Sequence, residues 1–176
     1  MPELTGKLDT PVNGPEGLPR FDGDAWDHVD WRHQEEQVRR LRGRIFKAVQ
    51  EGDWPLARNL QKLMVRSWSN TLVSVRQATQ RNAGRRTAGI DGLVALTSQA
   101  RAEMAVQVHA SIGSHAPSPV RRVYIPKARD KAKMRPLGIP VISDRCHQSR
   151  VRNALEPEWE ARFEPRVRHE AHCHCP

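Results

Sequence analysis

Two apolar stripes at helical spacing, separated by a short break, constrain the fold of this chain most. Within residues 31–53, apolar side chains recur on one helical face at Val38, Leu41, Ile45, Phe46 and Val49. A second stripe runs toward Gln80 through Leu56, Leu60, Leu63, Met64, Leu72 and Val75. Between them Gly52 can end one helix, and Asp53 can cap the next with Pro55 in its first turn. The pattern predicts two antiparallel helices whose stripes form a shared core.

The segments on either side of this helical pair have different compositions. Residues 1–26 are rich in Pro, Gly and Asp and have no period, which predicts a disordered lead-in. The segment "NAGRRTAGIDG", residues 82–92, contains three glycines and predicts a loop with positive φ or close backbone approach. That loop is either an ordinary turn or a glycine loop near phosphate. Residues 97–112 fit a helix or an alternating strand, and the alanines and the length favour a third helix.

A β-hairpin and a further helix complete the expected order of elements. "RRVYIP" and "RPLGIPVI" are typical of strands, and "ARDKAK" between them is typical of a turn. Pro126 and Pro140 suit strand ends or edges. "SDRCHQSRVRNALE" predicts a helix with Ser143 as its N-cap and Pro157 as a stop or kink, followed by a turn or two in "PEWEARF". The fold class is therefore expected to be α+β: a helical N-terminal part followed by a hairpin and a helix.

Positive charge is concentrated on the predicted hairpin. The whole chain has a formal net charge of +9, and residues 121–135 hold seven basic side chains against the single acid Asp130, a net +6. The seven are Arg121, Arg122, Lys127, Arg129, Lys131, Lys133 and Arg135. Such a ribbon suits a phosphate chain or a triphosphate, although solvated surface cations are the plain alternative. The arginines on the first helix are equally consistent with a solvated face and with an RNA contact.

Other functional classes lack support in the sequence. No apolar run approaches the ~20 residues that span a bilayer, and three cysteines without a signal peptide argue against a secreted disulfide scaffold, so a cytoplasmic protein is expected. In the tail "HEAHCHCP", consecutive Cys173, His174 and Cys175 would strain a single tetrahedral zinc site. No carboxylate cluster or catalytic triad is identifiable, so we expect no catalytic residues, no metal and no cofactor.

Six short motifs occur in a specific order: "TAGIDG", "RRVYIPK", "RPLGIP", "DR" followed by "Q", "ALEP" and "EARFEP". Over about residues 26–165 they resemble the N-terminal part of bacterial group II intron-encoded reverse transcriptases, also called maturases. The resemblance implies a reverse transcriptase N-terminal domain at 27–115, partial fingers at 116–165 and an aberrant tail at 166–176. It also implies triphosphate contacts by Lys127 and Arg135, and a template-proximal loop with Thr87, Gly89, Asp91 and Gly92. The further RNA-binding candidates are Arg121, Arg122, Arg129, Lys131, Lys133 and Arg145.

The sequence departs from this family after "RFEP". In the family, a "SYGFRPGR"-like segment and a palm with catalytic aspartates follow this motif. In the present sequence, "RVRHEAHCHCP" follows it instead. We therefore expect a truncated reverse transcriptase that binds RNA, with group II intron RNA as the leading partner and DNA as a second candidate. Polymerase activity is not expected, and Mg²⁺ is expected only in the full-length family enzyme. The alternatives are an accessory nucleic-acid-binding module for intron splicing or mobility, and a non-functional remnant. The oligomeric state is not specified by these features.

Overall fold

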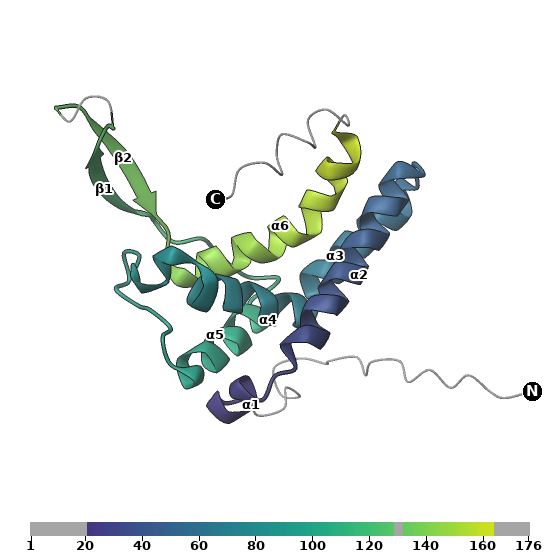
Figure 1. Ribbon diagram of the computed structural model, residues 1–176, viewed down its shortest axis with the longest axis horizontal. Helices are drawn as coiled ribbons and strands as arrows, with labels where there is room; N and C mark the ends of the chain where they lie inside the picture. Colours follow the sequence, from purple (N-terminus) through teal and green to yellow (C-terminus); the bar gives the residue numbers. More distant parts are fainter. Residues whose placement is uncertain (1–20, 129–131, 164–176) are drawn as a thin grey trace, which may run out of the picture.

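The computed structural model describes residues 21–128 and 132–163, which form a helical body with one projecting hairpin (Figure 1). The described helices are α1 (Gly23–Asp27), α2 (Trp31–Gln50), α3 (Trp54–Arg66), α4 (Trp68–Arg76), α5 (Ser98–Ala110) and α6 (Ile142–Arg162). A π-helix, η1 (Gln77–Arg81), and a 3₁₀ turn, η2 (Ala83–Arg86), follow α4. Strands β1 (Arg121–Pro126) and β2 (Met134–Ile139) form a two-stranded antiparallel sheet. The expected α+β class and order of elements are confirmed.

Part of the predicted lead-in is folded, which corrects the boundary at residue 26. Residues 1–20 lie outside the described residues, but α1 forms within 21–27. The Asp22 carboxylate caps it by accepting from Ala25 N at 3.1 Å, so this aspartate is a helix cap. Trp26 is only 1% exposed and packs edge-to-face on Trp31. Burial of this one large aromatic outweighs the polar composition of its neighbours.

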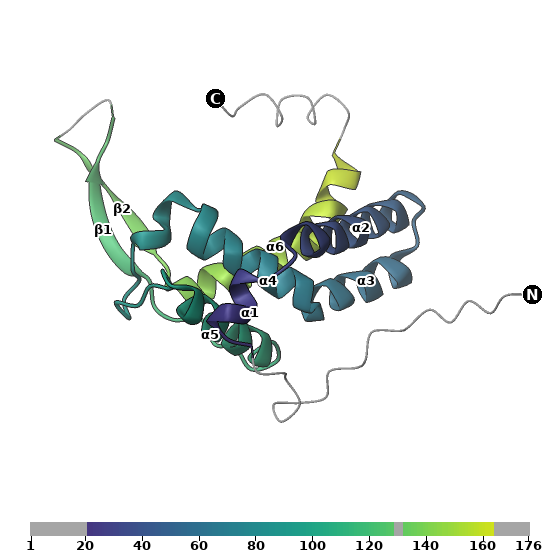
Figure 2. The same ribbon diagram turned by 60° about the horizontal axis from the view of Figure 1, so that its bottom comes forward.

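Helices α2 and α3 form the predicted antiparallel pair and lie side by side in two views (Figures 1 and 2). Asp53 caps α3 as expected, with its carboxylate accepting from Leu56 N at 3.0 Å. The second stripe, however, does not form one helix, because the chain turns at Ser67 and this residue caps α4. Leu56 and Leu63 are 41% and 53% exposed and do not join the core, because they lie at the edge of the α3 face that buries Leu60 and Met64.

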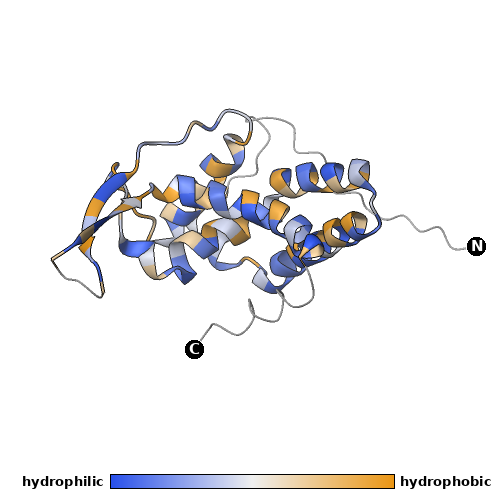
Figure 3. Ribbon diagram, turned by 90° about the horizontal axis from the view of Figure 1, so that it is seen from above, coloured by the Kyte–Doolittle hydropathy of each residue, from blue (hydrophilic) through white to orange (hydrophobic). Residues whose placement is uncertain are grey.

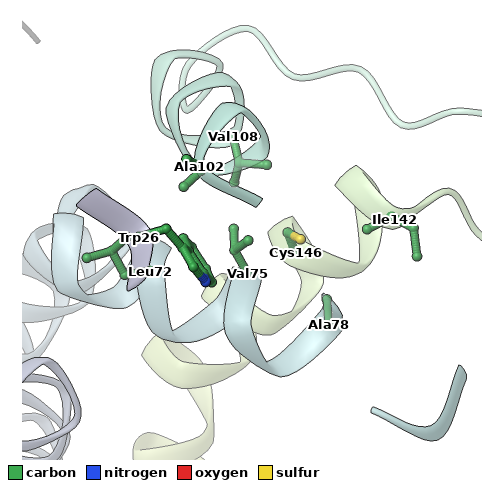
Figure 4. Packing of buried hydrophobic residues seen from close by; sticks show 9 residues of the cluster. Trp26, Leu72, Val75, Ala78, Ala102, Val108, Ile142 and Cys146 are labelled. Carbon is green, nitrogen blue, oxygen red and sulfur yellow. The ribbon is translucent and has the colours of Figure 1, made fainter. Parts of the chain in front are cut away.

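Two apolar clusters share α6 as a common wall. One cluster gathers α1, α4, η1, α5 and the start of α6 around Val75 (Figure 4). The other joins α2, α3 and Ala154 of α6. Asn70 connects the helices with polar contacts: its side-chain amide donates to Met64 O at 2.9 Å and Arg150 O at 3.2 Å, and its Oδ1 accepts from Asn153 at 2.8 Å. These bonds satisfy polar groups that would otherwise be costly to bury.

Helix α5 confirms the helical interpretation of residues 97–112, since Thr97 caps it by accepting from Ala100 N at 3.2 Å. Helix α6 differs from expectation at both ends. It begins at Ile142, with Val141 rather than Ser143 at the N-cap position, because Val141 and Ile142 are buried in the core. At its other end α6 continues through Pro157 to Arg162, so the helical turns expected after Pro157 are present and Pro157 does not end the helix. The same packing ends β2 at Ile139, so residues 141–142 are not part of the strand.

The hairpin extends away from the helices (Figure 2). Each of its strands contacts mainly the other strand. Its pairing runs from Arg121 opposite Ile139 to Pro126 opposite Met134. Hydrophobic and hydrophilic residues alternate along it (Figure 3). Several of its large apolar side chains are exposed: Tyr124, Met134 and Leu137, with Val120 just before β1.

Candidate nucleic-acid interface

The strand register sorts the hairpin's cations between its two faces. Directly opposed residues of an antiparallel pair lie on the same face, and side chains alternate along each strand. The pairs Arg121 with Ile139, Val123 with Leu137 and Ile125 with Arg135 therefore share one face. Beyond the last strand pair, Lys127 N donates to Lys133 O at 2.9 Å and extends the same register. We call the face with Arg121, Lys127, Lys133 and Arg135 the cationic face.

Lys127 and Arg135 are diagonal neighbours on the cationic face and do not lie directly across from one another. Arg135 is opposite Ile125, whereas Lys127 is opposite Lys133. Diagonal pairs on one face of a ribbon are about 7–8 Å apart at Cα, within reach of long side chains. Both residues are exposed. The two can therefore approach the same phosphate or two adjacent phosphates.

The remaining hairpin candidates differ in position. Arg122 lies on the opposite face, paired with Gly138, next to the exposed Tyr124. Lys133 lies on the cationic face, while Arg129 and Lys131 lie outside the described residues. The hairpin's described residues, 121–128 and 132–139, contain five cations and no carboxylate.

The arginines of the helices have a different electrostatic environment, because many of them face glutamates. Glu36 contacts Arg39 at 2.7 Å and Arg40 at 2.8 Å, and hydrogen bonds from these two arginines lower its pKa to about 2. Glu35 contacts Arg76 at 2.9 Å and Arg81 at 2.6 Å. Arg42 contacts Glu156 at 2.7 Å. These contacts favour the ion-paired, solvated interpretation of the α2 face. On the hairpin, Arg121, Arg122, Lys127 and Arg135 are exposed and form no ion pair with another described residue.

Arg145 has a structural position that the sequence did not reveal. Its guanidinium donates to Gly84 O at 2.9 Å, to Thr87 O at 2.7 Å and to Pro140 O at 2.8 and 3.0 Å. It thereby ties the loop after η2 to the end of the hairpin. Partial burial lowers its pKa below the ordinary arginine value. An RNA contact by Arg145 stays a prediction, and its donors already serve three backbone carbonyls.

The glycine loop lies close to the hairpin's base, and the structure explains why glycine is needed at two of its positions. A Cβ on Gly89 would lie 2.6 Å from Val141 Cα, so only glycine fits against this backbone. Gly92 has φ +70°, the left-handed conformation that favours glycine. Asp91 accepts from Leu93 N at 3.1 Å and shapes the turn. The loop's placement near a template stays a prediction.

A buried carboxylate fixes the other side of the hairpin's base. Asp144 is 4% exposed, accepts from Ser118 N at 3.0 Å and contacts His115 Nε2 at 2.9 Å. The His115 ring stacks on His147 at 3.8 Å between centroids. Burial, and then the charge of His115, lowers the pKa of His147 to about 4. Sequence reasoning missed this cluster, and the "DR…Q" motif was the only local signal near it.

Within the described ranges, no group of three or more His, Cys, Asp or Glu residues is arranged to hold a metal ion. Asp22, Asp24, Asp27 and Asp30 lie at α1 and its flanks, and the tail with Cys173 and Cys175 lies outside these ranges. None of the described helices is long and apolar enough to cross a bilayer.

Comparison with known proteins agrees with the motifs. Residues 26–108 match the N-terminal domain of reverse transcriptase. Protein YkfC of Escherichia coli K12 is 39% identical over 95 residues, which are 52% of this chain and 24% of that protein. Group II intron-encoded protein LtrA of Lactococcus lactis is 52% identical over 52 residues, 30% of this chain and 8% of that protein. Maturase-like protein 1 of Euglena gracilis is 27% identical over 145 residues, 82% of this chain and 31% of that protein.

These matches confirm that the chain is related to the N-terminal region of group II intron reverse transcriptases and maturases. Each match covers less than a third of the length of the curated relative.

Proposed function

We propose that this chain binds RNA through the cationic face of its hairpin, as the RNA-anchoring N-terminal part of a group II intron reverse transcriptase or maturase. The observation that carries the proposal is the concentration of exposed cations on one projecting two-stranded ribbon. Arg121, Arg122, Lys127 and Arg135 are exposed on this ribbon and form no ion pair with another described residue, whereas several arginines on α2 and α4 face glutamates. The relationship to a group II intron-encoded protein makes intron RNA the leading partner.

The physical basis of the proposed binding is the release of counterions from phosphates. A projecting ribbon reaches an extended polyanion without steric obstruction by the helical body (Figure 1). Arg135 can grip a phosphate with two parallel hydrogen bonds, and Lys127 supplies a compact charge beside it. Contacts of this kind are largely insensitive to sequence and weaken steeply with salt.

The roles of Lys127 and Arg135 can be tested by the double change Lys127→Ala with Arg135→Ala. The matched control is Arg58→Ala with Lys62→Ala on α3, where both side chains are exposed and one arginine and one lysine are again lost. Fluorescence anisotropy with a labelled single-stranded RNA gives Kd over a range of salt. The hairpin variant should lose about 1 kcal/mol or somewhat more of RNA-binding free energy. The magnitude of its slope of log K against log[salt] should decrease by roughly 1.4, at about 0.7 per lost contact.

Equal losses in the two double variants would show that binding is diffuse electrostatics and not the property of this face. A Kd that stays unchanged from low to moderate salt would contradict phosphate binding altogether. Single-stranded DNA of the same sequence is the second ligand, because equal affinity for both would mean that only the phosphates are recognised. An excess of free nucleoside triphosphate should compete weakly, since one triphosphate engages fewer cations than a strand.

A further inference from the structure

A polar groove of about 420 Å³ lies at the base of the hairpin, between η1 and α6. Its size falls in the range of about 300–1,000 Å³ that is usual for sites of small ligands. Pro140, which follows β2, contributes to its wall, so the groove adjoins the hairpin's root. The groove is lined by Gln77, Ala78, Asn82, Pro140, Arg145, Gln148, Ser149 and Arg152.

The lining has the chemistry of an anion site with additional hydrogen-bonding groups. No carboxylate is among the lining residues, and two arginines are. Arg145 is engaged by backbone carbonyls, which leaves Arg152 as the cation able to meet a ligand. Arg152 is exposed and has no ion pair with another described residue. The groove should therefore attract a single phosphate near Arg152.

Two glutamine amides and one hydroxyl complete the polar surface. Neither the Gln77 nor the Gln148 side chain hydrogen-bonds to another described residue, so each offers a free donor and a free acceptor. The Ser149 hydroxyl oxygen is buried and also has no hydrogen-bond partner in the described part of the chain. Unpaired buried polar groups are uncommon because they are costly, and they often mark a functional position. Gln77 begins a π-helical turn, a distortion that frequently occurs at functional sites.

We propose that this groove holds one nucleotide of an RNA strand, with its phosphate on Arg152 and its base edge or 2′-hydroxyl on Gln77 and Gln148. Glutamine amides match the adjacent donors and acceptors of a base edge, and RNA recognition commonly takes up an unstacked base in this way. An acidic peptide would also satisfy Arg152 and could pair its backbone with the amides, so RNA is chosen over a peptide on the relationship to a group II intron-encoded protein. The proposal deepens the RNA binding proposed above and rests on it, since the strand gripped by the hairpin would continue past Pro140 into the groove.

Nuclear magnetic resonance of the full chain tests the groove directly. Side-chain amide signals of glutamine and backbone signals of the hairpin are followed while hexauridylate is added. We expect the Gln77 and Gln148 side-chain signals to shift together with the Lys127 and Arg135 backbone signals. Uridine monophosphate should shift the two glutamines only weakly at the same concentration, because the strand supplies the additional hairpin contacts.

The possible outcomes separate the two proposals. Shifts of the hairpin signals without shifts of the glutamine signals would overturn the proposed groove site and leave the proposed hairpin function intact. Glutamine shifts without hairpin shifts would support the groove and overturn the hairpin assignment. Absence of both would overturn both. If the glutamine signals shift as much with the monophosphate as with hexauridylate, the groove is a site for a free nucleotide, and the proposal that it holds part of an RNA strand is overturned.

Substitutions provide a second readout through RNA affinity. Arg152→Gln should weaken hexauridylate binding about tenfold and lower the salt slope by about 0.7, whereas the matched control Arg58→Gln on α3 should change neither by as much. Gln77→Ala with Gln148→Ala should weaken binding about fivefold to tenfold without changing the salt slope, because no charge is lost. The control for the amides is Gln50→Ala at the exposed end of α2. Equal effects of the groove variants and their controls would overturn the assignment.

Discussion

Replacement of Gly89 by alanine should destabilise the fold at the base of the hairpin. An added Cβ would lie 2.6 Å from Val141 Cα, 2.7 Å from its N and 2.8 Å from its Cγ1. Favourable contacts between carbon atoms need about 3.5–4.0 Å, so one of the two segments must move by roughly 1 Å. Val141 cannot easily yield, because it is 2% exposed and stands at the N-cap position of α6.

The magnitude follows from two opposing terms. Overpacking of a tight site costs typically about 1–3 kcal/mol. Alanine also lowers the conformational entropy of the unfolded chain, which stabilises the folded state by about 0.4–1 kcal/mol. The net destabilisation should be about 1–2 kcal/mol, a considerable part of the ~5–15 kcal/mol that usually holds a domain together. RNA affinity should fall as well, because the loop that Arg145 ties to the hairpin base would be displaced.

Urea denaturation followed by tryptophan fluorescence measures the free energy of unfolding. The control is Gly43→Ala in the middle of α2, where an added Cβ meets nothing within 4 Å. Helix propensity predicts that this control stabilises by about 0.5–1 kcal/mol, so the two variants should shift stability in opposite directions. A Gly89→Ala protein as stable as the Gly43→Ala protein would refute the close approach of the loop and α6.

Three further outcomes are expected. Hydrogen exchange should show strong protection in α2, α3 and α4 and little in strands β1 and β2, because a ribbon without packed neighbours is marginally stable; equal protection would contradict this. Burial holds the pKa of His147 at about 4 against 6.5 in the unfolded chain, so its contribution to stability is full above pH 6.5 and is lost as the pH falls toward 4. The urea midpoint should therefore drop from pH 7 to pH 5, and less so in His147→Gln. Arg150→Met should cost about 2–4 kcal/mol in urea denaturation, because the Val65 and Val108 carbonyls lose their buried guanidinium donor; unchanged stability would mean that both carbonyls find other partners.

Much of the secondary structure could be predicted because its causes are local. Aspartate and threonine caps at Asp53 and Thr97 bond to amides three residues away, and the stripe on α2 repeats every three or four residues. At two of the places where the predictions were wrong, a distant contact was responsible. Burial of Trp26 ordered α1 within an otherwise polar segment, and burial of Val141 and Ile142 moved the start of α6.

The sequence by itself determined that a basic hairpin follows helical segments and that the chain carries the motifs of a reverse transcriptase N-terminal region. It also predicted phosphate as the hairpin's ligand chemistry, which stays a prediction. Only the tertiary structure decided which cations remain available. Arg145 reaches Gly84 across 61 residues of chain, Arg76 pairs with Glu35, and Lys127 and Arg135 keep their charge exposed on one face. Local periodicity carries no information on such contacts, because they depend on which segments meet when the apolar faces pack together.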